Sequence, residues 1–271
     1  MTRIAVVGGG KIGEALLAGL LEAGTATKDL VVAEPMAARA EELARLFGIR
    51  VTTVADAAEG ADIIVVAVKP SDVDSVLADL SSVDLDSERE QLLVSLAAGV
   101  PTSKFEPKLP AGFPVIRAMP NTPMLVGEGM TVIAPGRYAK DSHLALVRDV
   151  MSSVGKVVVV AEHQMDAVTA VSGSGPAYFF LIVEAMIDAA VSLGLTRKTA
   201  GELVVQTLIG SAAMLDRSDE SPQDLRAAVT SPAGTTAAAL REFERNGLRS
   251  GFMEAMHAAR DRSAQQGAQS D

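Results

Sequence analysis

The stretch that decides the fold is IAVVGGGKIGEALLAGL, residues 4–20. Four apolar residues precede three consecutive glycines, and an apolar pattern typical of a helix follows. This order predicts a β-strand, a tight glycine turn and the N-terminus of a helix. Gly8 permits the turn, Gly10 lets a ligand approach the backbone, and Gly13 lets the helix pack close to the strand. Free N–H groups at the helix start favour phosphate, so the stretch predicts a dinucleotide clamp. The predicted contacts are Gly8, Gly10, Lys11, Ile12 and Gly13.

A second apolar run, Leu30–Ala33, follows the predicted helix and ends in Glu34. A carboxylate at this place in a dinucleotide-binding domain accepts hydrogen bonds from the ribose hydroxyls. Arg39 follows closely and offers positive charge to a 2′-phosphate. The pair therefore predicts use of both NADH and NADPH, with a preference for NADH. The alternative is a glycine-rich turn in another kind of α/β protein.

Composition excludes several classes of protein. The chain has 271 residues, 48% of them hydrophobic, so it can bury the cores of one large domain or two smaller ones. A net charge of −10 without a dense basic patch argues against a nucleic-acid partner. The absence of cysteine excludes disulfides and thiolate metal sites, and it fits a reducing compartment. The most apolar segment, residues 167–183, is interrupted by SGSGP. We expect a helix–loop–helix there rather than a membrane span, and a cytoplasmic protein.

The pattern along the chain changes after Ala161. Before it, short β-branched runs alternate with helical periodicity, which predicts a doubly wound parallel sheet in residues 1–162. After it, the pattern predicts an all-α domain in residues 163–271, interrupted at 172–176, near 196–197 and at 218–236. The polar tail from Ala264 is predicted to fray. The predicted strands are Ile4–Val7, Leu30–Ala33, Ile63–Val68, Leu92–Ala97, Val115–Met119, Met130–Ala134 and Val157–Val160.

Apolar stripes on the predicted helices of the second half have two explanations. The stripe of Leu203, Leu208, Ala212 and Leu215 is compatible with an ordinary core. About a hundred helical residues with this much apolar surface can also bury it against a second copy. We favour a homodimer.

Three further segments lie where predicted strands end, the edge at which doubly wound sheets bind ligands. AVKP supplies Val68, Lys69 and Pro70, and SLAAGV supplies Ala97 among small residues that leave room for a flat ring. In RAMPNTP, two prolines fix a rigid loop around Asn121, whose amide is suited to a nicotinamide carboxamide. The alternatives are a solvated Lys69 and a structural connection at Asn121.

Two segments of the helical half resemble anion-binding helix starts. AVSGSGPAYFF places Ser174 before Pro176, where backbone donors are expected to be free. TSPAGTTAAAL places Gly234, Thr235 and Thr236 at the start of an alanine-rich helix. Both segments together favour a small carboxylate substrate, whereas the alternative for the threonines is a plain helix cap.

Metal and histidine chemistry find little support in the sequence. His143, His163 and His257 lack the spacing of metal ligands and are interpreted as surface residues. Glu184 and Asp188 stand four residues apart, but they lack a third acidic ligand, so we predict no metal site.

These motifs together resemble the pyrroline-5-carboxylate reductase family over essentially the whole chain. GGGKIG, AVKP, RAMPNTP, AVSGSGPAYFF and, above all, LRAAVTSPAGTTAAALREFE (residues 225–244) are similar to successive blocks of that family. The last block is SPGGTT-like in the family, so Ala233 stands where a glycine is usual.

The resemblance implies an N-terminal Rossmann-like domain and an all-α dimerisation domain that interlocks two subunits, often in a ring of dimers. It implies reduction of the cyclic imine pyrroline-5-carboxylate to proline by NADPH or NADH, the last step of proline biosynthesis. Thr236 would hydrogen-bond the ring nitrogen, and the amides around Gly234, Thr235 and Thr236 would hold the carboxylate. A protonated imine is already electrophilic, so orientation matters more than a strong base.

Two other functions share features with this sequence. The first is that of a β-hydroxyacid dehydrogenase, a family that shares the two-domain plan and needs a lysine on the long helix to handle the alcohol proton. This chain has no Lys or Arg between Val171 and Thr196, which argues against alcohol oxidation. A dimer that senses NAD(P) without turnover would not need a second site rich in donors. Oxidation of NAD(P)H on addition of pyrroline-5-carboxylate distinguishes these alternatives.

Overall fold

The computed structural model describes residues 2–85 and 91–268. The chain divides into two compact units. Unit 1 consists of Met1–Ser174 together with Ala258–Asp271, and unit 2 is Gly175–His257. These bounds differ from the predicted domains, 1–162 and 163–271, which stay a prediction.

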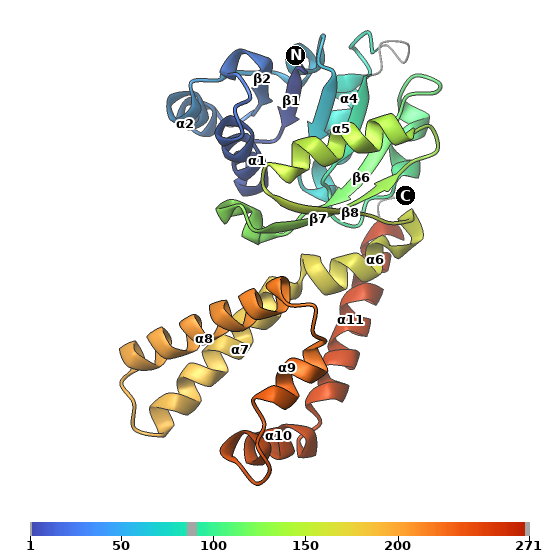
Figure 1. Cartoon of the computed structure of the whole chain (residues 1–271). Helices are drawn as coiled ribbons and strands as arrows, with labels where there is room; N and C mark the ends of the chain where they lie inside the picture. Colours follow the sequence, from blue (N-terminus) through green and yellow to red (C-terminus); the bar gives the residue numbers. More distant parts are fainter. Residues whose placement is uncertain (1, 86–90, 269–271) are drawn as a thin grey trace. The chain divides into compact units, whose positions relative to one another are not determined.

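Unit 1 is built on one mostly parallel sheet with the strand order β3-β2-β1-β4-β5-β6-β7-β8 within the described residues (Figure 1). The order reverses between β1 and β4, as in doubly wound folds, so the fold class predicted from sequence is confirmed. The strands are β1 Ile4–Val7, β2 Leu30–Ala33, β3 Arg50–Thr52, β4 Ile63–Val66, β5 Leu92–Ser95, β6 Val115–Met119, β7 Gly129–Pro135 and β8 Gly155–Val159.

The sheet is not parallel throughout, because β7 pairs antiparallel with β6 while β8 pairs parallel with β7. The connection from β6 to β7 is the short segment 120–128. A parallel pairing needs a crossover of about a dozen residues or more, so this segment allows only an antiparallel return.

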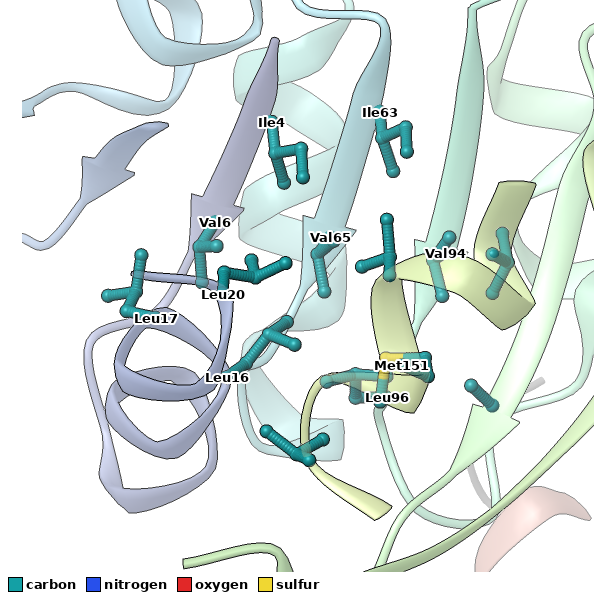
Figure 2. Packing of buried hydrophobic residues seen from close by; sticks show 14 of the residues in the cluster. Ile4, Val6, Leu16, Leu17, Leu20, Ile63, Val65, Val94, Leu96 and Met151 are labelled. Carbon is teal, nitrogen blue, oxygen red and sulfur yellow. The ribbon is translucent and has the colours of Figure 1, made fainter. Parts of the chain in front are cut away.

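Helices cover both faces of the sheet, and alternate residues of each strand feed two apolar clusters. Ile4 and Val6 pack on the face covered by α1 and α5, as Figure 2 shows around Leu16 and Met151. Ala5 and Val7 pack on the opposite face, with residues of α3 and α4. The helices of this part are α1 Lys11–Glu22, α2 Ala37–Phe47, α3 Val54–Ala58, α4 Val73–Leu80 and α5 Asp141–Ser152. Because helices cover both faces of the sheet, a ligand has access at the carboxyl ends of the strands, where doubly wound sheets bind their ligands.

The rest of the chain is helical, as predicted, with different interruptions. The helices are α6 Met165–Val168, a π-helical turn Thr169–Gly173, α7 Gly175–Ser192, α8 Arg197–Arg217, α9 Pro222–Ala228, α10 Thr235–Arg245 and α11 Leu248–Ala268. The predicted interruption at 218–236 contains α9, and a break at residues 246–247 was not predicted. The prediction of a frayed tail is wrong for residues 264–268, which continue α11, while residues 269–271 lie outside the described part.

The predicted loop at 172–176 is also wrong. Residues 169–173 form a π-helical turn, in which the Ser174 N–H donates to the Thr169 carbonyl at 2.8 Å. Only a bend at Ser174 separates this turn from α7. Glycine and serine suggested a loop, but a π turn absorbs one extra residue without leaving the helix.

The helices of unit 2 leave many large apolar side chains bare. Phe180 is 67% exposed, Leu181 64% and Leu193 85%, and α8 adds Leu203 and Ile209. Among the described residues, one helical run, Glu162–Ser192, is long and apolar enough to cross a membrane by length and composition. A single such helix is weak evidence for a membrane span. An exposed apolar face also marks a surface where another protein binds.

Candidate active site

The glycine turn after β1 has the geometry of a dinucleotide clamp. Gly8 has φ +105°, and a Cβ there would lie 2.6 Å from the Ala67 carbonyl oxygen. A Cβ on Gly13 would lie 2.1 Å from the Gly8 carbonyl oxygen. Both glycines are therefore required by the packing of the turn itself.

Gly10 differs, because no neighbouring atom of the described residues lies within 4 Å of the place where its Cβ would be. Gly10 is the N-cap of α1 and no side chain caps that helix, so Lys11 and Ile12 begin a helix with free backbone donors. Space and donors together fit a pyrophosphate, which needs close approach to the backbone.

A cavity of about 660 Å³ lies beside this turn, at the carboxyl ends of β1, β2 and β4. Of the predicted cofactor residues, Gly8, Glu34 and Val68 line it. Sequence reasoning missed the part of the wall at Thr52 and Thr53 because it missed the three-residue strand β3, and it did not single out the polar residues between Pro70 and the end of α4. The available signal was Gly48, the left-handed residue that ends α2, followed by an alternating segment. The missed polar lining residues are Thr52, Thr53, Asp72, Ser75 and Asp79.

Glu34 is held in place by backbone donors. Its carboxylate accepts hydrogen bonds of 2.9 Å from the N–H groups of Gly9 and Met36. A Cβ on Gly9 would lie 3.0 Å from Glu34 Oε2, so the middle glycine brings the turn and the carboxylate together. The carboxylate is fixed beside the cavity, where a ribose is expected.

Arg39 is tied into the same corner. Its Nε donates to the Gly9 carbonyl at 2.8 Å, and its other nitrogens bind Glu42 and Glu14. These hydrogen bonds, with Glu42 contributing most, raise the pKa of Arg39 above its ordinary value. To reach a 2′-phosphate, Arg39 would have to give up these partners.

The other predicted cofactor residues lie at the same edge of the sheet. Val68 stands against Gly8, where a Cβ would be 3.0 Å from Val68 Cγ1. Lys69 is exposed and precedes a short 3₁₀-helix, Pro70–Asp72, so only its backbone is fixed. Ala97 follows β5 and is 2% exposed. Their contacts with a cofactor stay predictions.

Asn121 is engaged by the protein itself. Its Nδ2 donates to the Ser172 carbonyl at 3.0 Å, and its Oδ1 accepts from the Met130 N–H at 2.8 Å. The side chain thus ties the β6–β7 turn to the π-helical turn. This geometry favours the structural alternative over a contact with nicotinamide, which stays a prediction.

A buried cation that sequence reasoning did not single out lies behind this loop. Arg117 on β6 is 6% exposed, and its guanidinium lies 3.7 Å from the Asp166 carboxylate and 4.0 Å from that of Glu162. Burial lowers the pKa of Arg117, and the two carboxylates oppose that shift. The partners of Arg117 come from α6 and from the 3₁₀ turn before it, more than 40 residues along the chain, so no local sequence signal reveals them.

Ser174 belongs to unit 1, and the start of α10 belongs to unit 2. Ser174 is half-buried, and its N–H is already bonded to Thr169, so the expected free donor is absent at this residue. At α10 the N-cap is Gly234 and carries no side-chain cap. Thr235 and Thr236 are its first two helical residues, so the alternative that they are caps is wrong.

Ala233 carries the strain of that turn. It has φ +58°, and among the described residues no other non-glycine residue has a positive φ. A Cβ on Gly234 would lie 2.4 Å from Ser231 Oγ and 3.1 Å from the Ser231 carbonyl oxygen, so the turn is tight next to Ala233. The tight turn leaves the first N–H groups of α10, and the hydroxyls of Thr235 and Thr236, without a side-chain partner within the described part of the chain. This group is suited to a carboxylate.

The histidines and the acidic pair behave partly as expected. The interpretation of His143 as a surface residue is wrong, since it is 6% exposed and its Nδ1 accepts from the Lys140 N–H at 3.0 Å. Asp188 pairs with Arg197 at 2.7 Å. Within the described residues, no group of three His, Asp or Glu side chains is placed to hold a metal ion.

Comparison with known proteins decides the family. Residues 162–266 match the profile described as pyrroline-5-carboxylate reductase dimerisation, and residues 3–99 match that of NADP oxidoreductase, coenzyme F420-dependent. A pyrroline-5-carboxylate reductase of Mycobacterium tuberculosis is 52% identical, over 98% of this chain and 97% of the relative. The chain belongs to the pyrroline-5-carboxylate reductase family.

Other members of the reductase family agree. The relative from Mycobacterium leprae is 54% identical, over 98% of this chain and 97% of its own length. The solved reductase from Coxiella burnetii has a TM-score of 0.92 and 35% identity, covering 98% of each chain. That from Plasmodium falciparum, solved with NADP bound, has a TM-score of 0.85 and 32% identity, again covering 98% of each chain. The similarity therefore includes both units.

Proposed function

We propose that this protein reduces 1-pyrroline-5-carboxylate to L-proline with hydride from NADPH or NADH, the last step of proline biosynthesis. The observation that carries the proposal is the match over 98% of the chain, at 52% identity, to a curated pyrroline-5-carboxylate reductase. The glycine turn and the open helix start at α10 supply the two kinds of site that this reaction needs.

The reaction makes modest demands on the protein. The reduced nicotinamide supplies a hydride to the imine carbon, and the ring nitrogen keeps its proton and becomes a secondary amine. The substrate carboxylate needs donors, and the imine carbon needs to be held near the nicotinamide. Strong acid–base catalysis is unnecessary, which agrees with the lack of a suitable histidine.

The α10 start is the proposed substrate site. The Gly234 N–H already donates to the Ser231 carbonyl at 3.0 Å, so the expected free donor is absent at this residue. The N–H groups of Thr235 and Thr236 stand at the positive end of the helix and suit a carboxylate. Thr236 would use its hydroxyl to hydrogen-bond the ring nitrogen and is the proposed catalytic residue. Ser174 is proposed to contribute its hydroxyl, since its N–H is already bonded.

The nucleotide is proposed to lie along the carboxyl edge of the sheet. Gly8, Gly10 and Gly13 would form the clamp with the first N–H groups of α1, and Glu34 would accept from the ribose. Val68 lines the same cavity as Glu34, and Lys69, Pro70 and Ala97 would line the other half of the cofactor.

Assembly and location complete the proposal. The match to a dimerisation profile over residues 162–266 agrees with the bare apolar helices of unit 2 and supports an oligomeric enzyme. We propose a homodimer as the basic unit, a ring of dimers as the full assembly, and a cytoplasmic location. Light scattering on the purified protein measures the assembly, and a dimer mass alone would rule out the ring.

The decisive experiment is an assay of the purified chain. NADH or NADPH is mixed with pyrroline-5-carboxylate, and loss of absorbance of the reduced nucleotide is followed while proline is measured. We expect equal amounts of nucleotide consumed and proline formed. Nucleotide binding without turnover would instead favour a sensor, and oxidation of a β-hydroxyacid with NAD⁺ would favour a dehydrogenase.

A further inference from the structure

The end of α11 packs against the loop that follows β5. A Cβ on Gly267 would lie 2.7 Å from the Gly99 carbonyl oxygen. Gly99 has φ +76°, and a Cβ on it would lie 3.5 Å from both the Ser263 carbonyl oxygen and Gln266 Cβ. The last turn of the helix and the loop therefore meet with backbone against backbone, at a place where only glycine fits on the helix side.

Polar contacts fix the helix end in this position. Ser263 is 3% exposed, and its hydroxyl donates to the Asp166 carboxylate at 2.8 Å. Asp166 also faces the buried guanidinium of Arg117 at 3.7 Å. The Asp166 carboxylate is half-buried and serves both a buried cation and a buried hydroxyl. Leaving these buried groups unpaired is costly, so these contacts anchor the helix end.

The other end of the loop after β5 is held by Glu162, which also lies near Arg117. Glu162 accepts hydrogen bonds from Thr102 N–H at 2.7 Å and Thr102 Oγ1 at 2.8 Å, and it lies 4.0 Å from Arg117. Residues 96–102 are thus fixed at Gly99 by α11 and at Thr102 by Glu162. All these residues belong to unit 1.

The place of this loop in the sheet gives the contact a functional meaning. The strand order reverses between β1 and β4, and a dinucleotide lies across that point with one half on each side. The cavity at β1, β2 and Glu34 would take the adenosine half. The nicotinamide half would then lie toward β4 and β5, where Ala97 and Gly99 belong to the loop that follows β5.

We propose that the last turn of α11, through Gly267 and Ser263, is a positioning element that sets the loop 96–102 against the nicotinamide. The expected effect on turnover rests on the proposed function, whereas the expected effect on nucleotide binding is independent of it. The helix end touches neither the adenosine cavity nor the glycine turn among the described contacts.

The test compares Gly267→Ala with Gly251→Ala. Both substitutions add one methyl group to a glycine of α11, but in the described part of the chain no atom beyond the helix's own backbone lies within 4 Å of a Cβ on Gly251. For each variant, calorimetry gives the Kd of NADH and of ADP-ribose, which lacks the nicotinamide. Light scattering checks the mass, and kcat and KM are measured with pyrroline-5-carboxylate.

For Gly267→Ala we expect the Kd of NADH to rise and kcat to fall, each by about tenfold, because a small displacement at the reacting end has a large effect. The Kd of ADP-ribose should stay within about twofold of wild type, as for a change remote from its site. Gly251→Ala should match the wild type in all four quantities. If the wild type lacks reductase activity, the proposed function fails while the two Kd values still decide the positioning role.

Ser263→Ala covers the case in which Gly267→Ala does not fold. It removes the hydroxyl that donates to Asp166. We expect the Kd of NADH to rise and the Kd of ADP-ribose to stay near the wild-type value, as for Gly267→Ala. Equal losses for both nucleotides, unchanged NADH affinity and kcat, or equal affinity of the wild type for NADH and ADP-ribose would each overturn the proposal.

Discussion

Glu34 is expected to govern the choice between the two nicotinamide nucleotides. Its carboxylate is fixed by the N–H groups of Gly9 and Met36, so it cannot swing away from a 2′-phosphate without losing both bonds. Repulsion of a phosphate by one nearby carboxylate costs about 1 kcal/mol or more. Glu34→Ser should therefore raise the NADPH/NADH ratio of kcat/KM by at least about fivefold.

The matched control for this prediction is Glu41→Ser, which removes the same charge from an exposed position on α2. It should leave the ratio within about twofold of wild type, since exposed charges are screened. An unchanged ratio in Glu34→Ser would remove Glu34 from the ribose pocket.

Thr236 is expected to act on the substrate and not on the fold. Gly234 is the N-cap of α10, so the Thr236 hydroxyl caps nothing. Thr236→Ala should lower kcat/KM by roughly ten- to a hundredfold, the effect of losing one hydrogen bond of about 1–3 kcal/mol. Thr236→Ser should keep most activity, and both variants should keep the wild-type affinity for NADH. A lowered thermal midpoint with normal kcat/KM in the alanine variant would make Thr236 structural.

Ala233 offers a test of local strain. A left-handed conformation costs an alanine about 1–2 kcal/mol, whereas glycine adds about 0.5–1 kcal/mol of chain entropy to the unfolded state. Ala233→Gly should therefore stabilise the protein by up to about 1 kcal/mol, which raises the thermal midpoint by about 2 °C. Differential scanning calorimetry measures this, and a lowered midpoint would show that the turn carries no such strain.

The sequence predicted the roles of single residues better than it predicted which other residues their side chains contact. The three glycines and Glu34 were found because their roles follow from spacing along one strand and one turn. The partners of Asn121 and Arg117 come from segments far away in sequence, at Ser172 and Asp166, and no local pattern encodes them. Ser174 lost its expected free donor because a π turn forms where glycine and serine suggested a loop.

Among the elements, the β1–α1 turn permits a clean separation of folding from binding. A Cβ on Gly13 would meet the Gly8 carbonyl oxygen at 2.1 Å, whereas one on Gly10 would meet no protein atom. Gly13→Ala should destabilise the protein by about 1–3 kcal/mol, the usual cost of overpacking. Gly10→Ala should leave the thermal midpoint of the free protein unchanged and weaken NADH at least about tenfold, because the methyl group occupies the space for the pyrophosphate.

Calorimetry of both variants, with and without NADH, checks this pair. Tight NADH binding by Gly10→Ala would show that no phosphate approaches the turn there. A normal midpoint for Gly13→Ala would show that the helix can move back from the strand.

Strong periodicity or a clear cap made elements predictable, and short or interrupted elements were missed. β3 has three residues and no apolar run. The helix α9 lay hidden between two Ser-Pro pairs, although Ser221 as N-cap, Pro222 at the first helical position and Asp224 are a recognisable helix start. The end of α11 looked too polar and small to be ordered, but its order comes from contacts with Gly99 and Asp166.

At the scale of the whole molecule, the sequence predicted a doubly wound half followed by a helical half because periodicity changes so sharply near residue 160. It did not predict that the last residues of the chain belong to unit 1. Such a return depends on packing between distant segments, and periodicity carries no information about it.

The bare apolar side chains of α7 and α8 make folding of the finished enzyme a second-order process. If covering Phe180, Leu181 and Leu203 requires another molecule, mass action links the melting temperature to the amount of protein present. For a two-state dimer of this size, the thermal midpoint should rise by roughly 1 °C for each tenfold increase in concentration. Scanning calorimetry over a hundredfold range measures this slope, and a flat line would contradict the linkage. Newly made chains would then mature more slowly when they are scarce, so the yield of active reductase would depend on how fast the cell produces it.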